Sequence, residues 1–138
     1  MSGQRRTRLL IVEDNIADVL LMREALFEFF PYPVDITTVS DGGEALAILS
    51  QGAQFDVVIL DLSLPKVGGH AFLERYKSSY PPIAVFTSSW NPDDGKRALA
   101  LGACDFVRKP ISYDAYVQSV CGIVERWGNT RPAEAHPV

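Results

Sequence analysis

The sequence of 138 residues contains few cysteines, is short of basic residues, and lacks any long apolar run. Its two cysteines, Cys104 and Cys121, form no spaced set, so we expect no disulfide framework and a reducing compartment. No segment approaches the roughly 20 apolar residues of a membrane span, and no charged-then-apolar leader opens the chain. These absences predict a cytoplasmic protein that does not interact with membranes.

Lysine and arginine number 13 against 17 aspartates and glutamates, so the net charge is -4. Nucleic-acid binding needs a basic stripe, whereas the one basic run, Arg5, Arg6 and Arg8, is short, so we expect no nucleic-acid partner. The apolar content of 47% and the length suit one domain. We expect flexible segments at 1–7 and 129–138 around a folded domain at 8–128, with no output domain after it.

Short apolar or β-branched runs alternate along the chain with segments of helical length. The runs expected to form strands are 8–12, 34–39, 55–61, 83–87 and 104–107. Nearly continuous apolar runs are typical of strands that are covered on both faces. Regular alternation with helices therefore predicts an α/β domain with a parallel sheet between two helix layers.

Several expected helices begin and end at residues suited to capping. The residues expected to cap helix starts are Asn15, Asp41, Asn91 and Ser112. Pro92 follows one of these caps, and Gly128 is expected to stop the last helix. In the first helix, spacings of three, four and seven indicate a shared apolar face. That face comprises Ile16, Val19, Leu20, Leu26 and Phe27.

Aromatic residues and histidines outside these patterns allow more than one interpretation. The aromatic cluster of Phe27, Phe29, Phe30 and Tyr32 is interpreted as packing rather than a binding patch. Trp90 is expected in a loop beside the site described next. For Tyr113, Tyr116 and Trp127, packing and a partner surface remain equally open. His70 and His136 lack partners at ligand spacing and are expected at the surface.

Polar side chains gather at the expected carboxyl ends of four strands. They are Glu13 and Asp14 after the first, Asp61 at the third, Thr87 at the fourth, and Lys109 with Pro110 after the fifth. In open α/β sheets, ligands bind outside these strand ends, where the strand order reverses. The sequence therefore predicts a single polar site at this edge of the sheet.

The predicted site has the groups needed for phosphoryl transfer. Three neighbouring carboxylates repel each other, and a divalent cation with hard oxygen ligands, Mg²⁺, relieves that repulsion. Asp61 can act as a carboxylate nucleophile that forms an aspartyl phosphate. Lys109 and the Thr87 hydroxyl can contact phosphoryl oxygens, so the set provides positioning and charge neutralisation.

Five stretches together resemble the response-regulator receiver family over residues 8–127. They are LLIVEDN (9–15), DGGEAL (41–46), VVILDLSLPKVGG (57–69), VFTSS (85–89) and FVRKP (106–110). The resemblance implies a flavodoxin-like α/β fold with five helices and a five-stranded parallel sheet of order 2-1-3-4-5. It also implies a signalling receiver rather than an enzyme, which accepts phosphate on Asp61 from a histidine kinase or phosphotransfer protein.

The same resemblance implies the metal ligands. Asp14 and Asp61 would bind Mg²⁺, with the main-chain carbonyl of Ser63 as a third ligand. Glu13 would act mainly through water. Ser63 stands where many members of the family carry Asn or a basic residue, which leaves the lifetime of the phosphate open.

A switch is implied as well. Thr87 matches the switch hydroxyl, Lys109 the family lysine, and Phe106 the switch aromatic, here without a tyrosine hydroxyl. Phosphate on Asp61 would draw Thr87 and Lys109 inward, and Phe106 would turn into the vacated space. The bond before Pro110 is expected to be cis.

A narrower set of matches resembles the stand-alone regulators that pair with phytochrome-type kinases. It comprises EDNIAD (13–18), SLP (63–65), FTSS (86–89) and ERW (125–127). The implied partner is a light-sensing histidine kinase, although those relatives often have Pro in place of Ile16. They can also dimerise through the face built by the fourth helix, fifth strand and fifth helix.

Three other functions compete with this interpretation. A haloacid-dehalogenase-type phosphatase would need a second Asp where Ser63 stands. A flavodoxin would need a phosphate-binding loop where this chain has Glu13, Asp14 and Asn15, and the two acids would repel an anionic cofactor. A docking module that works without phosphorylation remains open, as does a role as a phosphate sink.

Overall fold

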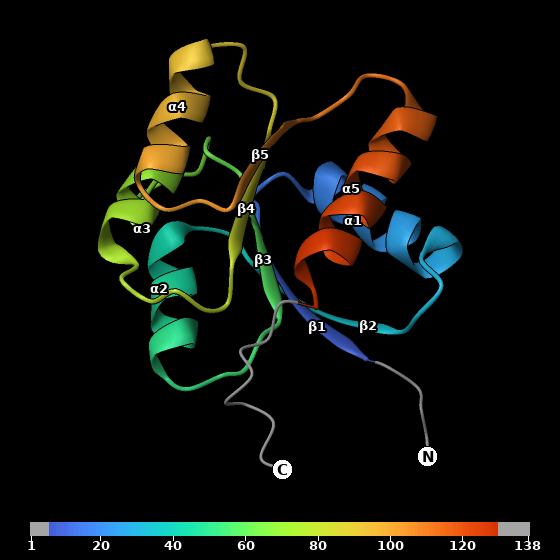
Figure 1. The fold of residues 1–138 in the computed structure, drawn as a ribbon, viewed down its shortest axis with the longest axis horizontal. Coiled ribbons are helices and arrows are strands. Elements are labelled where there is room, and N and C mark those ends of the chain that lie inside the picture. The colour runs from blue at the N-terminus through green and yellow to red at the C-terminus, as the bar shows by residue number, and fades with distance from the viewer. Residues whose placement is uncertain (1–5, 130–138) are drawn as a thin grey trace.

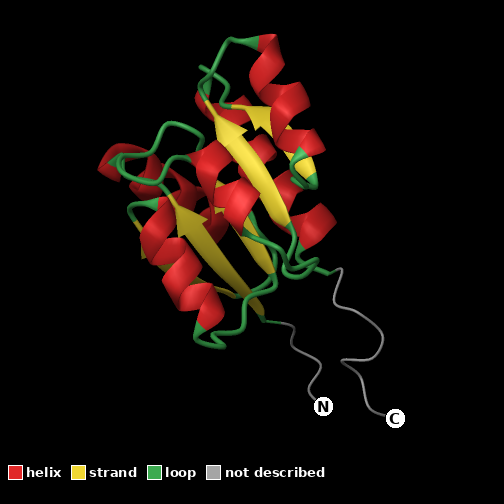
Figure 2. Cartoon of the chain, turned by 90° about the vertical axis from the view of Figure 1, so that its left-hand side faces the viewer, coloured by secondary structure: helices red, strands yellow, loops and turns green. Residues whose placement is uncertain are grey.

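The computed structural model describes residues 6–129, which form a five-stranded parallel sheet between two layers of helices (Figures 1 and 2). The strands are β1 (Thr7–Val12), β2 (Val34–Val39), β3 (Val57–Leu60), β4 (Ile83–Thr87) and β5 (Asp105–Arg108). Their order is β2-β1-β3-β4-β5. The predicted flavodoxin-like order is therefore confirmed.

Helices cover both faces of the sheet (Figure 1). They are α1 (Ile16–Phe29), α2 (Gly42–Ser50), α3 (Gly69–Arg75), α4 (Pro92–Ala100) and α5 (Tyr113–Trp127). On one face, Leu9 and Ile11 of β1 share a core with residues of α1 and α5. On the other face, Leu10 and Val12 share a core with residues of α2, α3 and α4. Successive strand residues thus serve two cores, which explains the continuous apolar runs.

The predicted helix caps are confirmed. The side chains of Asn15, Asp41, Asn91 and Ser112 each accept a backbone N–H from the first turn of their helix. Pro92 opens α4, where its missing N–H costs no hydrogen bond. Gly128 follows the last residue of α5 as its C-cap.

Three strand boundaries differ from those expected. β1 begins one residue earlier, at Thr7, and β5 is shifted by one residue. β3 is confined to Val57–Leu60, so Phe55 and Asp56 precede it. The Asp56 carboxylate accepts the backbone N–H of Arg8 at 2.8 Å, and Asp56 donates its own N–H to the Arg8 carbonyl at 2.7 Å. These bonds fasten the chain beside β1 just before the buried strand begins.

The predicted apolar face of α1 is partly wrong. Ile16, Leu20 and Phe27 are 74%, 60% and 89% exposed, while Met22 and Leu26 are buried. Spacings of four and seven place the exposed three on one stripe of the helix. The helix therefore carries two apolar stripes, and the sheet and α5 cover only the second.

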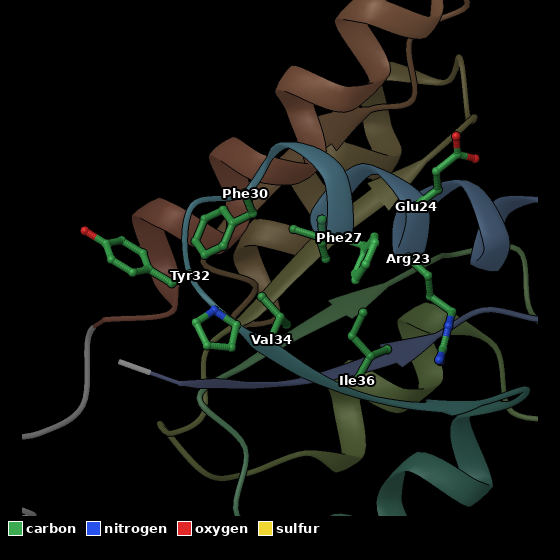
Figure 3. Close-up of a pocket in the computed structure, with 9 residues that line it drawn as sticks. Arg23, Glu24, Phe27, Phe30, Tyr32, Val34 and Ile36 are labelled. Carbon is green, nitrogen blue, oxygen red and sulfur yellow. The ribbon is translucent and has the colours of Figure 1, made fainter. Parts of the chain in front are cut away.

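The aromatic cluster at the end of α1 is also more exposed than expected. Phe27 and Tyr32 lie at the surface, whereas Phe30 packs against the core. A groove of about 730 Å³ lies here between α1 and β2. Figure 3 shows Phe27 and Phe30 above Val34 and Ile36 in this groove. It contains none of the predicted site residues, and no helix within residues 6–129 is long and apolar enough to cross a membrane.

Gly69 allows α3 to approach the end of β3 closely. A Cβ at Gly69 would lie 2.6 Å from the Leu62 Cα and 2.9 Å from the Asp61 carbonyl oxygen. We expect Gly69→Ala to lower the free energy of unfolding by about 1–3 kcal/mol, because backbone must shift. Gly122→Ala is the matched helical control, since its Cβ would meet only the end of the Arg126 side chain. It should raise that free energy by about 0.5–1 kcal/mol in urea unfolding. Equal effects of the two changes would contradict this prediction.

The Asp105 carboxylate joins β5 to the end of α5. Burial alone would raise the pKa of Asp105, but hydrogen bonds from Trp127 and Arg126, each 3.0 Å long, hold it below its usual range. A lowered folded pKa gives stability that is present above the unfolded pKa of about 3.9 and is lost as the pH falls through the folded value.

We therefore expect Asp105→Asn to lower the free energy of unfolding by about 1–2 kcal/mol at pH 7. The difference from the unchanged protein should shrink as the pH falls below about 4. Urea unfolding at several pH values measures both. Asp35→Asn is the control, because the Asp35–Arg6 pair is exposed and should contribute little. A penalty for Asp105→Asn that is the same at all pH values would show that the charge is not its cause.

Candidate functional site

The structure places the predicted residues at the carboxyl edge of the sheet. Glu13 and Asp14 follow β1, and Asp61 follows β3, which pairs with β1. The Asp61 N–H donates to the Val12 carbonyl at 3.1 Å, so this hydrogen bond extends the β1–β3 pairing to the site. The parallel sheet thus brings together carboxylates that are 47 or more residues apart in the chain (61 minus 14).

Three carboxylates form the centre of the site. One oxygen from each of Glu13, Asp14 and Asp61 lies within 4.8 Å of the others. Glu13 and Asp61 are buried, whereas Asp14 is exposed. The cluster is therefore reached from solvent on the Asp14 side, while the charges of the other two carboxylates are largely desolvated.

Lys109 provides the positive charge of the site. Its Nζ lies 2.7 Å from Glu13 Oε1, 3.0 Å from Asp18 Oδ2 and 3.5 Å from Asp61 Oδ2. The Lys109 side chain is only 6% exposed. Burying an ammonium is costly unless it is paired and hydrogen-bonded, and these three carboxylates meet that requirement.

Asp18 is a member of the site that the sequence did not reveal. Besides binding Lys109, its Oδ1 accepts a 2.9 Å hydrogen bond from the Tyr116 hydroxyl. An acid in the first turn of a helix commonly interacts with the helix dipole alone, so the position of Asp18 gives no signal of a site. The sequence alone could not show the role of Asp18, because that role depends on the packing of α1 against α5, which brings Tyr116 and Asp18 together.

The charged groups of the cluster shift one another's pKa values. Burial raises the pKa of Glu13 to about 7, and the charge of Asp61 adds to that rise, although Lys109 opposes it. Burial works against the charge of Lys109, yet its hydrogen bond to Glu13 and the charge of Asp61 raise its pKa overall. Lys109 is therefore a permanent cation, and the acidic cluster remains short of positive charge.

The donor set fits a hard divalent cation. Carboxylate oxygens are the ligands that Mg²⁺ prefers, and one or two of them suffice with water completing the shell. One ammonium lies against three carboxylates, those of Glu13, Asp18 and Asp61, so the cluster carries an excess of acidic groups that a cation would offset. Ser63 lies beside the cluster, where its N–H donates to Asp61 Oδ1 at 3.3 Å.

Thr87 ends β4 and is fully buried. Its carbonyl accepts the Lys109 N–H at 2.7 Å, and its Oγ1 accepts the Ser89 N–H at 3.4 Å. Phe106 lies on β5, next to β4, with its ring against α4, where a Cβ on Gly95 would come within 3.2 Å of it. The expected switch residues therefore occupy neighbouring strands, with the phenyl ring against a helix.

Two expectations at this edge are wrong. The bond before Pro110 is not cis; within the described residues the one cis bond is Tyr80–Pro81. Both isomers of an X–Pro bond lie within about 1 kcal/mol, so the sequence around a proline does not select one. His70 is half-buried and contacts Asp94 rather than lying free at the surface. His136 lies outside the described residues.

For the aromatic residues near the site, the structure shows which ones pack inside the protein and which ones are exposed. Tyr116 is buried and binds Asp18, so packing is correct there. Trp90 is 71% exposed in the loop after β4, as expected, and its ring lies 3.8 Å from the Arg108 guanidinium. Tyr113 is exposed near the site, whereas Trp127 donates to Asp105.

Comparison with known proteins agrees with this geometry. Residues 9–120 match the family described as response regulator receiver domain. The response regulator SaeR of Staphylococcus aureus is 33% identical over 122 residues, which are 87% of this chain and 51% of the relative. The chain thus spans about half the length of the curated relatives it matches.

Solved structures show the same fold over nearly the whole chain. The phosphorylated cyanobacterial phytochrome response regulator RcpA has a TM-score of 0.81 at 34% identity, covering 93% of this chain and 98% of that one. The Mn²⁺-bound response regulator Rcp1 has a TM-score of 0.78 at 28% identity, covering 91% and 97%. Receiver domains are signalling modules of two-component systems that bind Mg²⁺ or Mn²⁺ at an acidic pocket and take a histidine kinase or phosphotransfer protein as partner.

Residues 9–120 match the family, and the fold gathers at one edge the side chains of Glu13, Asp14, Asp61 and Lys109. This chain is therefore a member of the response regulator receiver domain family.

Proposed function

We propose that this receiver domain accepts a phosphoryl group on Asp61 and signals through contact with other proteins. The observation that supports the proposal most strongly is the buried Lys109 ammonium, which lies against Asp61 at 3.5 Å while Glu13 and Asp18 hold it in place. A cation held beside a carboxylate can neutralise an incoming anionic group by exchanging only its longest contact, here the one to Asp61.

Of the two buried carboxylates of the cluster, Asp61 is the better nucleophile because its oxygens are less engaged than those of Glu13. Both oxygens of Glu13 are bound, one to Lys109 at 2.7 Å and one to the Asn15 N–H at 3.1 Å. The Asp61 oxygens make longer contacts, 3.5 Å to Lys109 and 3.3 Å to the Ser63 N–H. A lone pair on Asp61 is therefore easier to release for attack on phosphorus.

In the proposed reaction, an Asp61 oxygen forms a bond to phosphorus as the bond from phosphorus to the leaving atom breaks. The leaving group keeps that electron pair. Lys109 binds one phosphoryl oxygen, and the Thr87 hydroxyl donates to another. Asp14, Asp61 and the Ser63 carbonyl would hold Mg²⁺, with Glu13 acting through water. When bound, the ion neutralises charge between the carboxylates and the phosphoryl group.

The output is proposed to run through the surface of α4, β5 and α5. Movement of Thr87 toward the phosphoryl group would let Phe106 turn inward, and local charge changes of this kind commonly bias a two-state element. The same surface is proposed as the contact site for other proteins or for a second copy of the chain in a homodimer. Because the Phe106 ring carries no hydroxyl, the change would pass through packing alone.

The upstream partner is proposed to be a phytochrome-type histidine kinase. The support is the likeness to RcpA, at 34% identity over 93% of this chain. Transfer from a phosphorylated phytochrome-type kinase should be at least ten times faster than from an unrelated histidine kinase, because partner surfaces set such preferences. Radiolabel transfer over time measures this. Equal rates from both kinases would contradict the pairing and leave the acceptor function intact.

The acceptor function is tested by intact mass after incubation with acetyl phosphate. We expect the mass of one phosphoryl group to be added in the presence of Mg²⁺ and none in its absence. Asp61→Asn should abolish the gain, because the amide nitrogen and oxygen are poor nucleophiles. Asp93→Asn, which changes an exposed acid on α4, should leave the gain unchanged.

The outcomes separate the competing functions. If the unchanged protein gains no mass although it binds Mg²⁺, it is a docking module that works without phosphorylation. If it gains mass but its binding to other proteins and its oligomeric state do not change, it is a phosphate sink. A gain that survives Asp61→Asn would place the acceptor elsewhere.

A further inference from the structure

A chain of side-chain contacts connects α3 and α4 to the loop after β4. His70 Nε2 lies 3.3 Å from Asp94 Oδ1, and the other carboxylate oxygen of Asp94 accepts the Ser89 hydroxyl. His70 comes from the first turn of α3, and Asp94 from the first turn of α4. Three segments that are separate in sequence are thereby fastened to each other beside the end of β4.

The direction of these hydrogen bonds follows from the chemistry of the groups. The Ser89 hydroxyl, and then His70, hold the pKa of Asp94 below its usual range, so Asp94 is a carboxylate and can only accept. His70 Nε2 must therefore carry the hydrogen. Within the described residues, the buried Nδ1 of His70 has no hydrogen-bond partner. An unfilled lone pair there costs less than an unpaired N–H would, which favours the same tautomer.

The chain of contacts ends at the switch threonine. Ser89 donates its backbone N–H to Thr87 Oγ1 at 3.4 Å, while its own Oγ accepts the Asn91 N–H at 3.3 Å. Because Ser89 uses a lone pair of Thr87 Oγ1, the hydroxyl hydrogen of Thr87 stays available to donate. The orientation of that hydroxyl thus depends on where Ser89 is held.

We infer that His70 is a positioning residue for the acceptor reaction, acting through Asp94 and Ser89 to orient the Thr87 hydroxyl toward a phosphoryl oxygen. This inference rests on the proposed function, because it assigns a further residue to the same site. His70 does not touch the reacting atoms. His70 holds the Asp94 carboxylate in place, and Asp94 in turn holds the loop at Ser89. The position of Ser89 then orients the Thr87 hydroxyl.

A second bridge between α3 and α4 provides a matched control. Arg97 Nη2 lies 3.7 Å from Glu74 Oε2, with both side chains largely exposed. Glu74 is on α3, as His70 is, but its bridge does not lead to Ser89. Loss of either bridge loosens the two helices, whereas only loss of the His70 bridge releases Thr87.

The test compares His70→Leu with Glu74→Leu in the whole chain, using beryllofluoride in saturating Mg²⁺ as the phosphoryl probe. We expect His70→Leu to weaken beryllofluoride binding and to slow acetyl phosphate labelling by about five-fold, the effect of one ordinary hydrogen bond. Glu74→Leu should change each by less than about two-fold, as exposed ion pairs contribute little. His70→Gln, whose amide can still donate to Asp94, should restore most of the loss.

Two further measurements separate positioning from general damage. Mg²⁺ affinity should be unchanged in His70→Leu, because none of the three carboxylates is altered. Asp94→Ala removes both carboxylate oxygens, breaks the chain of contacts from α4, and should weaken beryllofluoride binding in the same direction. If His70→Leu binds beryllofluoride as the unchanged protein does, or if Mg²⁺ affinity falls equally, the inference is wrong.

The loop itself can be observed without any phosphoryl group. Amide NMR shifts of Ser89 and Asn91 should move in His70→Leu and not in Glu74→Leu. If they move and the unchanged protein neither labels nor binds beryllofluoride, the proposed function fails although the contacts are real. If labelling works and these amides do not move, the positioning role alone is overturned.

Discussion

The buried ammonium of Lys109 is the interaction on which the site depends. It stands at the end of β5 and contacts carboxylates from the loop after β1, from α1 and from the end of β3. Without it, Glu13 and Asp61 would be two desolvated charges of the same sign, which proteins avoid by taking up a proton or a cation. One ammonium offsets only part of that charge, and burial raises the pKa of Glu13 to about 7, with the charge of Asp61 adding to the rise. The cluster is thus stable enough to form and still attracts further positive charge.

The strand order explains why these groups meet. β1 lies between β2 and β3, so the connections after β1 and β3 leave the sheet on opposite faces and open a crevice at their carboxyl ends. α1 then crosses one face and α3 the other. The close approach of Gly69 to Leu62 keeps α3 near the end of β3, so the segment that carries Asp61 is held between a strand and a helix. The geometry of the site is therefore a property of the fold, and its chemistry depends on a few side chains.

The sequence predicted those parts of the molecule that depend on local patterns. A buried strand can be recognised in the sequence because it needs a continuous run of apolar residues. A helix cap such as Asn15 can be recognised because it needs a single side-chain oxygen at the helix start. Ile16 and Phe27 were placed on one apolar face with Leu26, yet they are exposed and Leu26 is buried, because spacing does not show whether anything covers a residue. Asp18 and His70 were missed as functional candidates for a related reason. Their roles depend on partners 98 and 24 residues away, Tyr116 and Asp94.

The loop after β4 connects the site to the surface of α4, β5 and α5. On one side of it Ser89 binds Asp94 of α4, and on the other the Trp90 ring lies against Arg108 of β5. The Phe106 ring lies close to Gly95 of α4, where a Cβ would come within 3.2 Å of it. Phe106 is half-buried, and a turn of its ring inward has to displace packed side chains or move the helix, since interiors are packed as densely as crystals. A tyrosine here could also form a hydrogen bond through its hydroxyl, whereas the Phe106 ring can affect its neighbours only through packing. In the proposed switch, the small residue at position 95 would therefore matter as much as the aromatic residue it faces.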